Sequence, residues 1–449
     1  MNKSLFVWCS LCLLVCFTAT GAASTVKIRG YVTSIPDANS VAILDDAIAY
    51  APGTQLQNCA ATGADGIGLV VGTLIEAEGL WTAPHRFSAV KINCDNSQFT
   101  REISESAYLQ EEPLEAAKSA PGTQVRLKAD GELLLVGESA QKGAARFTEA
   151  STETSTQNMV GSQIHYRGVR NNDGSILASM IEVGSPAPGD AYKNPGGITV
   201  VPAIEPKSGL RILEFRKGDK VHGRLKLFPV TEVQDYVKQL GLSLLPPAAA
   251  VTKRPVEFRF FVVEDPSINA EALPDGTTFV NTGLLAAAQN EAQLAFVMSH
   301  EIAHVLQAHH WREVNDTRAK RVLITIAAIA GSGYIGDLSL YLGQIGLATV
   351  VNGYSRRVEN QADRLGLQNT IDHGYDPRPA VAFFRIMVER YRQRSTSAIW
   401  SNHESALTRG SFLTVQLARQ YPQERFSSSR VDTPAFQAMK DAMGPVKIE

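Results

Sequence analysis

The 449-residue chain has little cysteine and almost no net charge. Its 43 basic and 45 acidic side chains give a formal charge of −2. Nucleic-acid-binding domains usually carry a basic patch, so we expect no nucleic acid partner. Three of the five cysteines (Cys9, Cys12 and Cys16) lie within the first 23 residues. The other two, Cys59 and Cys94, form no C-x-x-C pair, which excludes a thiol redox motif and a zinc site built from cysteines.

Long hydrophobic runs are also scarce beyond the amino terminus. Two apolar stretches, 322–335 and 338–351, are interrupted by Gly331, Gly333 and Asp337. Each is shorter than the roughly 20 residues that span a bilayer. We therefore expect two buried helices here, with a hairpin that faces a membrane as the alternative.

The first 23 residues have the pattern of a secretory signal peptide. Lys3 precedes an apolar run over 5–20, and the small residues 21–23 follow. This order predicts export with removal of residues 1–23, into the periplasm of a Gram-negative cell and otherwise into the medium. In an exported chain, two cysteines favour a disulfide between Cys59 and Cys94. Two buried free thiols are the alternative, because the sequence does not fix the distance between their Cα atoms.

Residues 24–185 consist of short runs that alternate apolar and polar residues between glycine, asparagine and aspartate, a pattern typical of β-strands. An internal repeat at a constant offset of 89 residues predicts two related small β units, shaped as barrels or sandwiches. Partner binding and a spacer role are both open for them. The positions that match between the two copies of the repeat are Gly72, Ile75, Gly79, Phe87, Ala89 and Ile92 in the first copy and Gly161, Ile164, Gly168, Ile176, Ala178 and Ile181 in the second.

The prolines and glycines of 186–225 indicate a linker or irregular lead-in.

His300, Glu301 and His304 form the pattern H-E-x-x-H inside an apolar stretch that we predict to be helical. Residues four apart lie on one face of a helix, about 6 Å from each other, so the two imidazoles can hold one Zn²⁺. Glu301 stands beside them and can take a proton from metal-bound water as the general base. The alternative is two histidines on an ordinary helix surface, and it is disfavoured because the pattern is rare by chance.

A third zinc ligand is expected in a later helical stretch. Glu359 and Asp363 stand four residues apart, so both lie on the same helix face. We predict that Glu359 binds the metal and that Asp363 accepts the outer N–H of a ligating histidine, which fixes its tautomer. Without the upstream pattern, these carboxylates would read as a charged helix surface paired with Arg356, Arg357 and Arg364.

Three separate motifs, in the order in which they follow along the chain, resemble those of peptidase family M48. This family includes the CAAX prenyl endopeptidases and outer-membrane quality-control proteases. The motifs are H-E-x-x-H at 300–304, S-R-x-x-E-x-x-x-D at 355–363, and the segments 269–276 and 280–285. The resemblance covers about residues 230–415 and implies a gluzincin fold. It also implies zinc ligation by His300, His304 and Glu359, with Glu301 as the base and Asp363 in support.

The same resemblance implies where a substrate lies. It places the strand formed by Thr277, Thr278, Phe279 and Val280 at the border of the cleft, where an extended polypeptide could pair with it. The implied substrates are unfolded or misassembled envelope proteins. Association with a membrane surface or with outer-membrane proteins is implied as well.

His403 and Arg409 are similar to the family's late His-Pro-x-x-x-x-Arg element, with Glu404 in place of proline. The resemblance implies that one of them stabilises the oxyanion of the tetrahedral intermediate, or that His403 closes the resting zinc as a ligand. An ion pair of Arg409 in a helix-start loop is equally open. His309 matches a further family histidine, but it stands five residues after His304, off the ligand face, and we do not assign it as a ligand.

Together these patterns predict an exported zinc endopeptidase. It would have an N-terminal all-β region over 24–185, a lead-in over 186–225, and an α+β, mainly helical metallopeptidase domain over 226–449. The alternatives are a catalytically latent zinc-fold binding or chaperone protein and an adaptor that acts through its β units. Glu301 favours the enzyme, because a protein without catalysis has no chemical need for the base.

Overall fold

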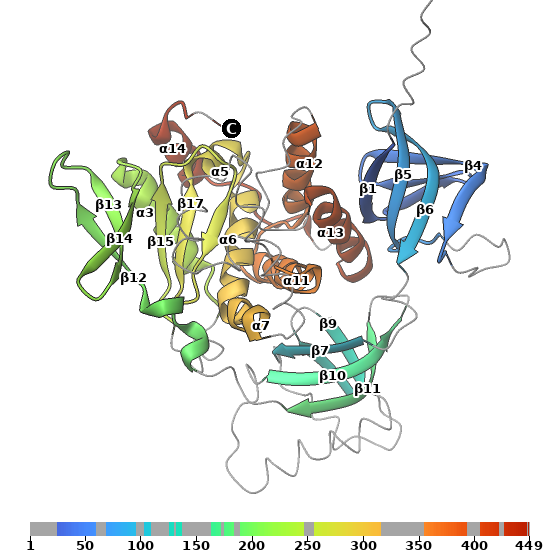
Figure 1. The fold of residues 1–449 in the computed structure, drawn as a ribbon, viewed down its shortest axis with the longest axis horizontal. Coiled ribbons are helices and arrows are strands. Elements are labelled where there is room, and N and C mark those ends of the chain that lie inside the picture. The colour runs from blue at the N-terminus through green and yellow to red at the C-terminus, as the bar shows by residue number, and fades with distance from the viewer. Residues whose placement is uncertain are drawn as a thin grey trace, which may run out of the picture.

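The structure is a computed structural model, and it arranges the chain as two small β units beside a larger, mainly helical part (Figure 1). The predicted signal peptide, the apolar runs within 322–351 and His403 lie outside the residues that it describes. The described ranges are 25–59, 69–95, 103–108, 125–129, 132–136, 163–171, 175–183, 189–246, 256–315, 354–392, 405–421, 426–446 and 448.

The first β unit is a six-stranded sheet with the order β1-β5-β6-β4-β3-β2, in which β4 and β6 run parallel. Buried and exposed residues alternate along β6, as the period-two pattern predicts. Cys59 and Cys94 form a disulfide with their Cα atoms 4.9 Å apart, so the predicted disulfide is confirmed and free thiols are excluded. The strands are β1 (Val26–Tyr31), β2 (Ser34–Asp37), β3 (Ser40–Ile43), β4 (Asp46–Gln57), β5 (Leu74–Ala83) and β6 (Arg86–Asp95).

The second β unit repeats the strand order of the first. Its sheet has the order β7-β10-β11-β9-β8, and β9 and β11 again run parallel. These strands therefore correspond in turn to β1, β5, β6, β4 and β3, which confirms the two related β units. The strands are β7 (Ile103–Tyr108), β8 (Val125–Ala129), β9 (Glu132–Val136), β10 (Gln163–Arg170) and β11 (Ile176–Val183).

A glycine at the same place in each unit explains part of the sequence match. Gly79 and Gly168 lie at register shifts of β5 and β10. A Cβ at Gly79 would lie 2.0 Å from the carbonyl oxygen of Ser88, and a Cβ at Gly168 would lie 2.4 Å from that of Leu177. Both distances are far inside van der Waals contact, so the bulge needs glycine in both copies.

We expect Gly79→Ala to lower the free energy of unfolding by about 1–3 kcal/mol, the usual cost of overpacking. Gly53→Ala is the matched control, because Gly53 lies on β4 with no atom within 4 Å of an added Cβ. Urea unfolding of both variants and of the unmodified chain checks this. Equal stabilities for the two variants would contradict the close approach.

Residues 189–225, the described part of the predicted linker over 186–225, are more ordered than we predicted. Two short 3-10 helices, η2 (Gly189–Tyr192) and η3 (Pro195–Gly197), lead into an antiparallel sheet of β12 (Thr199–Ile204), β13 (Arg211–Lys217) and β14 (Lys220–Lys226). Pro202 lies within the edge strand β12, where a missing N–H is tolerated, so proline does not break the structure here. The sheet shares a hydrophobic core with the catalytic part through Val200, Leu213, Phe215, Leu225, Val263, Leu273 and Phe279.

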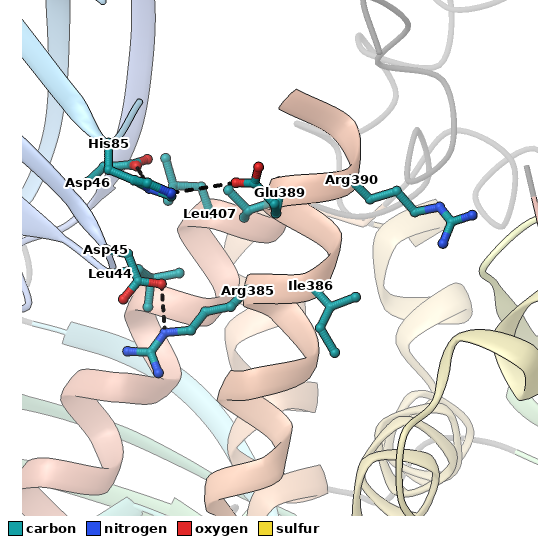
Figure 2. A pocket seen from close by; sticks show the side chains of 10 residues that line it. Leu44, Asp45, Asp46, His85, Arg385, Ile386, Glu389, Arg390 and Leu407 are labelled. Atoms are coloured by element: carbon teal, nitrogen blue, oxygen red, sulfur yellow. Dashed lines mark hydrogen bonds and ion pairs between the residues drawn. The ribbon is translucent and has the colours of Figure 1, made fainter. Parts of the chain in front are cut away.

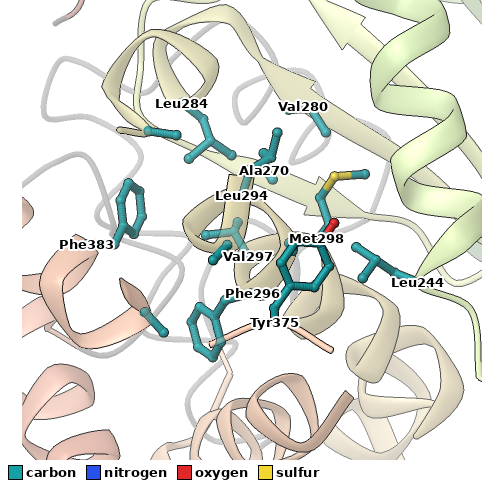
Figure 3. Packing of buried hydrophobic residues seen from close by; sticks show 14 of the residues in the cluster. Leu244, Ala270, Val280, Leu284, Leu294, Phe296, Val297, Met298, Tyr375 and Phe383 are labelled. Atoms are coloured by element: carbon teal, nitrogen blue, oxygen red, sulfur yellow. The ribbon is translucent and has the colours of Figure 1, made fainter. Parts of the chain in front are cut away.

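Helix α6 (Glu291–Leu306) is the centre of the larger part, and all 16 of its residues are buried. A helix surrounded by protein must be apolar on most sides, and Figure 3 shows Leu294, Phe296 and Met298 packed among side chains of the surrounding elements. The sheet β15-β17-β16 lies on one side of α6 and helices α11, α12 and α13 lie on the other (Figure 1). This arrangement confirms the α+β, mainly helical fold. None of the described helices is long and apolar enough to span a membrane.

The elements are α3 (Thr231–Ser243), β15 (Arg259–Val263), β16 (Ala270–Ala272), β17 (Thr277–Asn281), α5 (Thr282–Ala287), α6, α7 (His309–Asn315), α11 (Arg356–Asp372), α12 (Arg378–Arg392), α13 (Ala406–Gln420) and α14 (Pro434–Met443).

Candidate metal centre and active site

Helix α6 places His300, Glu301 and His304 in the middle of the core. The helix begins after Asn290, whose side chain accepts a hydrogen bond from the backbone N–H of Gln293 (3.1 Å) and so caps the first turn. The Nε2 atoms of the two histidines lie 3.0 Å apart, and both side chains are buried. The helix thus directs both imidazoles to one point.

Helix α11 brings Glu359 to the same point. Its carboxylate oxygens lie 3.6 Å from Nε2 of His300 and 3.5 Å from Nε2 of His304. Gly366 permits this approach of the two helices, because a Cβ there would lie 3.0 Å from the backbone nitrogen of His300. A tetrahedral ion with bonds of about 2.0–2.1 Å separates its ligand atoms by about 3.3 Å, so the three groups fit one metal ion.

Asp363 and Arg409 support His300 from behind. Asp363 Oδ1 lies 3.1 Å from His300 Nδ1, and Arg409 donates to Asp363 through Nη2 (2.7 Å) and Nε (3.1 Å). Burial would raise the pKa of Asp363, but Arg409 and His300 outweigh it and lower that pKa to about 2. The ionised carboxylate therefore accepts the Nδ1–H of His300, which leaves the Nε2 lone pair for a metal.

The structure shows which groups Arg409 contacts. Its side chain is 1% exposed, and Nη1 lies 3.5 Å from the Glu359 carboxylate in addition to the contacts with Asp363. The structure therefore shows the ion-pair alternative. Arg409 neutralises the two carboxylates, and its Nη2 also lies 3.2 Å from Nε2 of His300, so its role as an oxyanion donor stays a prediction.

His304 has an outer partner that the sequence reading missed. Its Nδ1 lies 3.0 Å from Nδ1 of His309, and Nε2 of His309 lies 3.1 Å from Oε1 of Gln361. If Nε2 of His304 binds a metal, its Nδ1 carries the proton and donates to His309, which in turn donates to Gln361. Burial and Arg312 hold the pKa of His309 well below its ordinary value, so the ring stays neutral as this arrangement requires. His309 is thus a support of a ligand and not a ligand.

We expect His309→Phe to weaken zinc affinity about 10- to 100-fold, the range typical of lost outer partners. The phenyl ring fills the site but leaves the Nδ1–H of His304 without an acceptor. Competition with a chromophoric chelator measures the affinity, and His222→Phe at an exposed position of β14 is the control. Unchanged affinity in His309→Phe would exclude the supporting role.

Glu301 lies at the edge of the sheet. Its Oε2 accepts a hydrogen bond from the backbone N–H of Ala272 on β16 (3.0 Å). Asn281 donates to the carbonyl of Asn269, and Leu273 donates to that of Thr277, so the alternating antiparallel pattern turns the peptide groups of Ala270 and Ala272 away from β17. In the described part of the chain, no strand pairs with this outer edge of β16.

The predicted substrate strand needs correction for this reason. Thr277, Thr278, Phe279 and Val280 form β17, which pairs with β15 on one side and with β16 on the other. All four residues are fully buried. A central strand has no free edge for a peptide, so the segment identified from the family motif lies one strand away from the edge that faces the base.

Tyr354 completes the surroundings of the metal centre. Its ring stacks on that of His304, with the centroids 4.2 Å apart and the planes inclined by 26°. Burial and the carboxylates of Glu301 and Glu359 raise its pKa far above the ordinary value, so the phenol keeps its proton. The tyrosine precedes the S-R-x-x-E motif by one residue, but nothing in the pattern signals its contact with His304.

Comparisons with known proteins agree with this geometry. The sequence model of peptidase family M48 matches residues 231–428, and that of a domain of unknown function, DUF5666, matches residues 29–93. The beta-barrel assembly-enhancing protease of Escherichia coli is 28% identical over 244 residues, which are 51% of this chain and 48% of that protein. The mitochondrial metalloendopeptidase OMA1 of Schizosaccharomyces pombe is 32% identical over 155 residues, which are 34% of this chain and 45% of that protein.

The chain thus spans less than half the length of each of these two relatives. The family model covers all residues that converge at the metal centre, from His300 on α6 to Arg409 on α13. The spacing of the motifs, the His300–His304–Glu359 cluster and the family model lead to one conclusion. Through residues 231–428, this chain belongs to peptidase family M48.

Proposed function

We propose that this chain is a zinc endopeptidase that cleaves unfolded polypeptides in the cell envelope. The observation that carries the proposal is the convergence of His300, His304 and Glu359, with Glu301 beside them at the outer edge of β16. Two imidazoles and one carboxylate are a donor set of catalytic zinc sites, which keep a further position open. Bound zinc would lower the pKa of water to about 7 and polarise the peptide carbonyl.

Each residue then has a distinct task. Asp363 and His309 lie at the outer nitrogens of His300 and His304 (3.1 and 3.0 Å), so each can hold its ligand in the tautomer that presents Nε2 to a metal. Glu301 takes a proton from the attacking water and returns it to the leaving amine. Its hydrogen bond from Ala272 N–H fixes the carboxylate at the strand edge.

The outer edge of β16 supports a binding mode for the substrate. The peptide groups of Ala270 and Ala272 turn away from β17. An extended chain could pair, as an added strand, with those of their groups that Glu301 does not occupy. Because Glu301 is bonded to the same edge, a peptide paired there would pass beside the base. Such pairing uses backbone groups, so it would accept any unfolded sequence and would reject folded proteins.

The names of the relatives and the disulfide support the location and the substrate class. The Escherichia coli relative is named a beta-barrel assembly-enhancing protease, and disulfides persist in oxidising compartments outside the cytosol. We therefore propose export to the periplasm and misassembled outer-membrane β-barrel proteins as substrates.

The test uses purified chain that begins at Ser24, with one outer-membrane β-barrel protein offered both in its unfolded form and folded in detergent. We expect one zinc per chain, cleavage of the unfolded form alone, loss of cleavage with a chelator, and recovery when zinc is added back. Cleavage that resists the chelator would contradict the metallopeptidase. Bound zinc without cleavage would favour the latent binding protein.

A further inference from the structure

The first β unit contacts the helices that carry the metal site. Tyr31 at the end of β1 accepts a hydrogen bond from Asn360 of α11 through its hydroxyl (3.0 Å). Its backbone N–H donates to Ser411 Oγ of α13 (2.9 Å), and its ring centroid lies 5.5 Å from that of Phe412. Thr408 of α13 also donates to the β1 backbone, at the carbonyl of residue 29 (3.1 Å).

The second β unit contacts α11 through a buried carboxylate. Glu132 is fully buried, and Arg170 of its own unit donates to it twice, at 2.9 and 2.8 Å. Arg364 of α11 lies 3.0 Å from the same carboxylate. Burial would raise the pKa of Glu132, but the two arginines outweigh this effect and lower that pKa. The carboxylate of Glu132 is therefore ionised beside both guanidinium groups. Separating this unit from α11 would take the buried Arg364 away from this carboxylate, and leaving a buried charge without its partner is costly.

The two units direct the end of the same hairpin, β3–β4 in the first and β8–β9 in the second, toward the catalytic part. The register pairs Ile43 with Asp46 and Ala129 with Glu132, so Asp46 and Glu132 occupy equivalent positions. Asp46 is also buried and bonds His85 (3.0 Å), whose other nitrogen lies 3.7 Å from Glu389 of α12. Figure 2 shows these contacts beside a cavity of about 800 Å³ between the first unit and α12.

The contact residues and the metal-site residues alternate along α11. Asn360 follows Glu359, and Arg364 follows Asp363, by one position each. Adjacent helix residues point about 100° apart, so one face of α11 holds the metal site while the next face holds both β units. On α13, Thr408 and Ser411 flank Arg409 in the same way. A shift of either helix would therefore move the contacts and the site together.

We propose that the two β units act as a clamp on α11 and α13 that sets the positions of Glu359, Asp363 and Arg409. Functional sites must be held within about 0.5 Å of their working geometry, and the clamp supplies this restraint from outside the catalytic part. The proposal gives the first β unit, which contains the match to the domain of unknown function at residues 29–93, the task of positioning these helices. The inference rests on the metal centre of the proposed function but not on peptide hydrolysis.

Zinc affinity of variants that touch no ligand tests the clamp. Tyr31→Phe removes the hydroxyl that Asn360 contacts but keeps the ring, and Glu132→Gln removes the charge that Arg364 contacts. We expect each to weaken zinc binding about two- to tenfold, less than the loss of a direct outer partner, and the double variant to weaken it further. Glu76→Gln is the control, because Glu76 pairs with Lys27 on the exposed surface of the first unit.

Hydrogen exchange gives a second readout that does not depend on how the variants fold. Coupling between two sites is reciprocal, so zinc should slow amide exchange over residues 26–32, where the Tyr31 N–H is bonded to Ser411. Wild-type zinc affinity in folded Tyr31→Phe and Glu132→Gln, with exchange unaffected by zinc, would overturn the clamp in favour of a spacer. If the unmodified chain binds no zinc, that result would contradict the proposed metal centre and, with it, the clamp.

Discussion

Glu301→Gln is expected to abolish measurable peptide cleavage while the chain keeps one zinc per molecule. General acid–base groups contribute about 10² to 10⁴ in rate. Glu301 is an acid beside the ligands that is not part of the His300–His304–Glu359 cluster, whereas Asp363 is held in an ion pair with Arg409. The amide oxygen of glutamine can still accept the hydrogen bond from Ala272 N–H. The variant should therefore fold and bind metal as the unmodified chain does.

Zinc content by elemental analysis and the initial rate of cleavage are measured on the same preparation. Glu257→Gln is the matched control, because Glu257 is an exposed acid of the same domain. A Glu301→Gln variant that retains zinc and cleaves at the unmodified rate would exclude Glu301 as the base. Loss of zinc together with activity would instead assign Glu301 to the metal-binding group.

Glu359→Gln is expected to weaken zinc binding more than about 100-fold, beyond the upper end of the range for outer partners. The change removes the anionic ligand at the point where the two imidazoles meet. Arg409 keeps its two hydrogen bonds to Asp363, so the loss of a partner for its Nη1 should not unfold the domain. Chelator competition measures the affinity, and cleavage should recover in part at high zinc concentration.

Glu232→Gln, at an exposed position in the first turn of α3, controls for the change of charge. If Glu359→Gln binds zinc as tightly as the control variant, Glu359 is not a ligand. If cleavage does not recover at any zinc concentration, Glu359 has a further task in the reaction besides holding the metal.

The sequence predicted the parts of the site that follow from helix periodicity. His300 and His304 are four residues apart, as are Glu359 and Asp363, so each pair shares a face wherever its helix lies. The repeat in the β region was detectable because glycine is required at Gly79 and Gly168 by a close approach of the neighbouring strand. Local rules of this kind leave a record in one stretch of sequence.

Contacts between separate elements could not be predicted in this way, because no local pattern in the sequence signals them. His309 follows a turn after α6, where Ala308 has a positive φ of 50°, and this change of direction returns its ring to His304 although the helical count points it elsewhere. The family motif located the sheet, but only the pairing of three strands shows that β17 is central and that β16 is an edge strand. The buried pair of Glu132 and Arg364 joins residues 232 positions apart, which no periodicity can reveal.

The β units also change what the site requires. A reading of the sequence separates residues 24–185 from the catalytic part, and leaves them as a binding module or a spacer. The structure joins them to α11 and α13 at residues next to Glu359, Asp363 and Arg409. Variants in the β region are therefore expected to change the metal centre through the helices that carry it.

Zinc anomalous scattering from crystals of the chain grown with zinc tests the central claim most directly. The account predicts one strong peak within about 2.0–2.2 Å of His300 Nε2, His304 Nε2 and a carboxylate oxygen of Glu359, with Glu301 outside bonding distance. A principal peak elsewhere, for example between Asp46 and His85 of the first β unit, or a site that does not include Glu359, would contradict it.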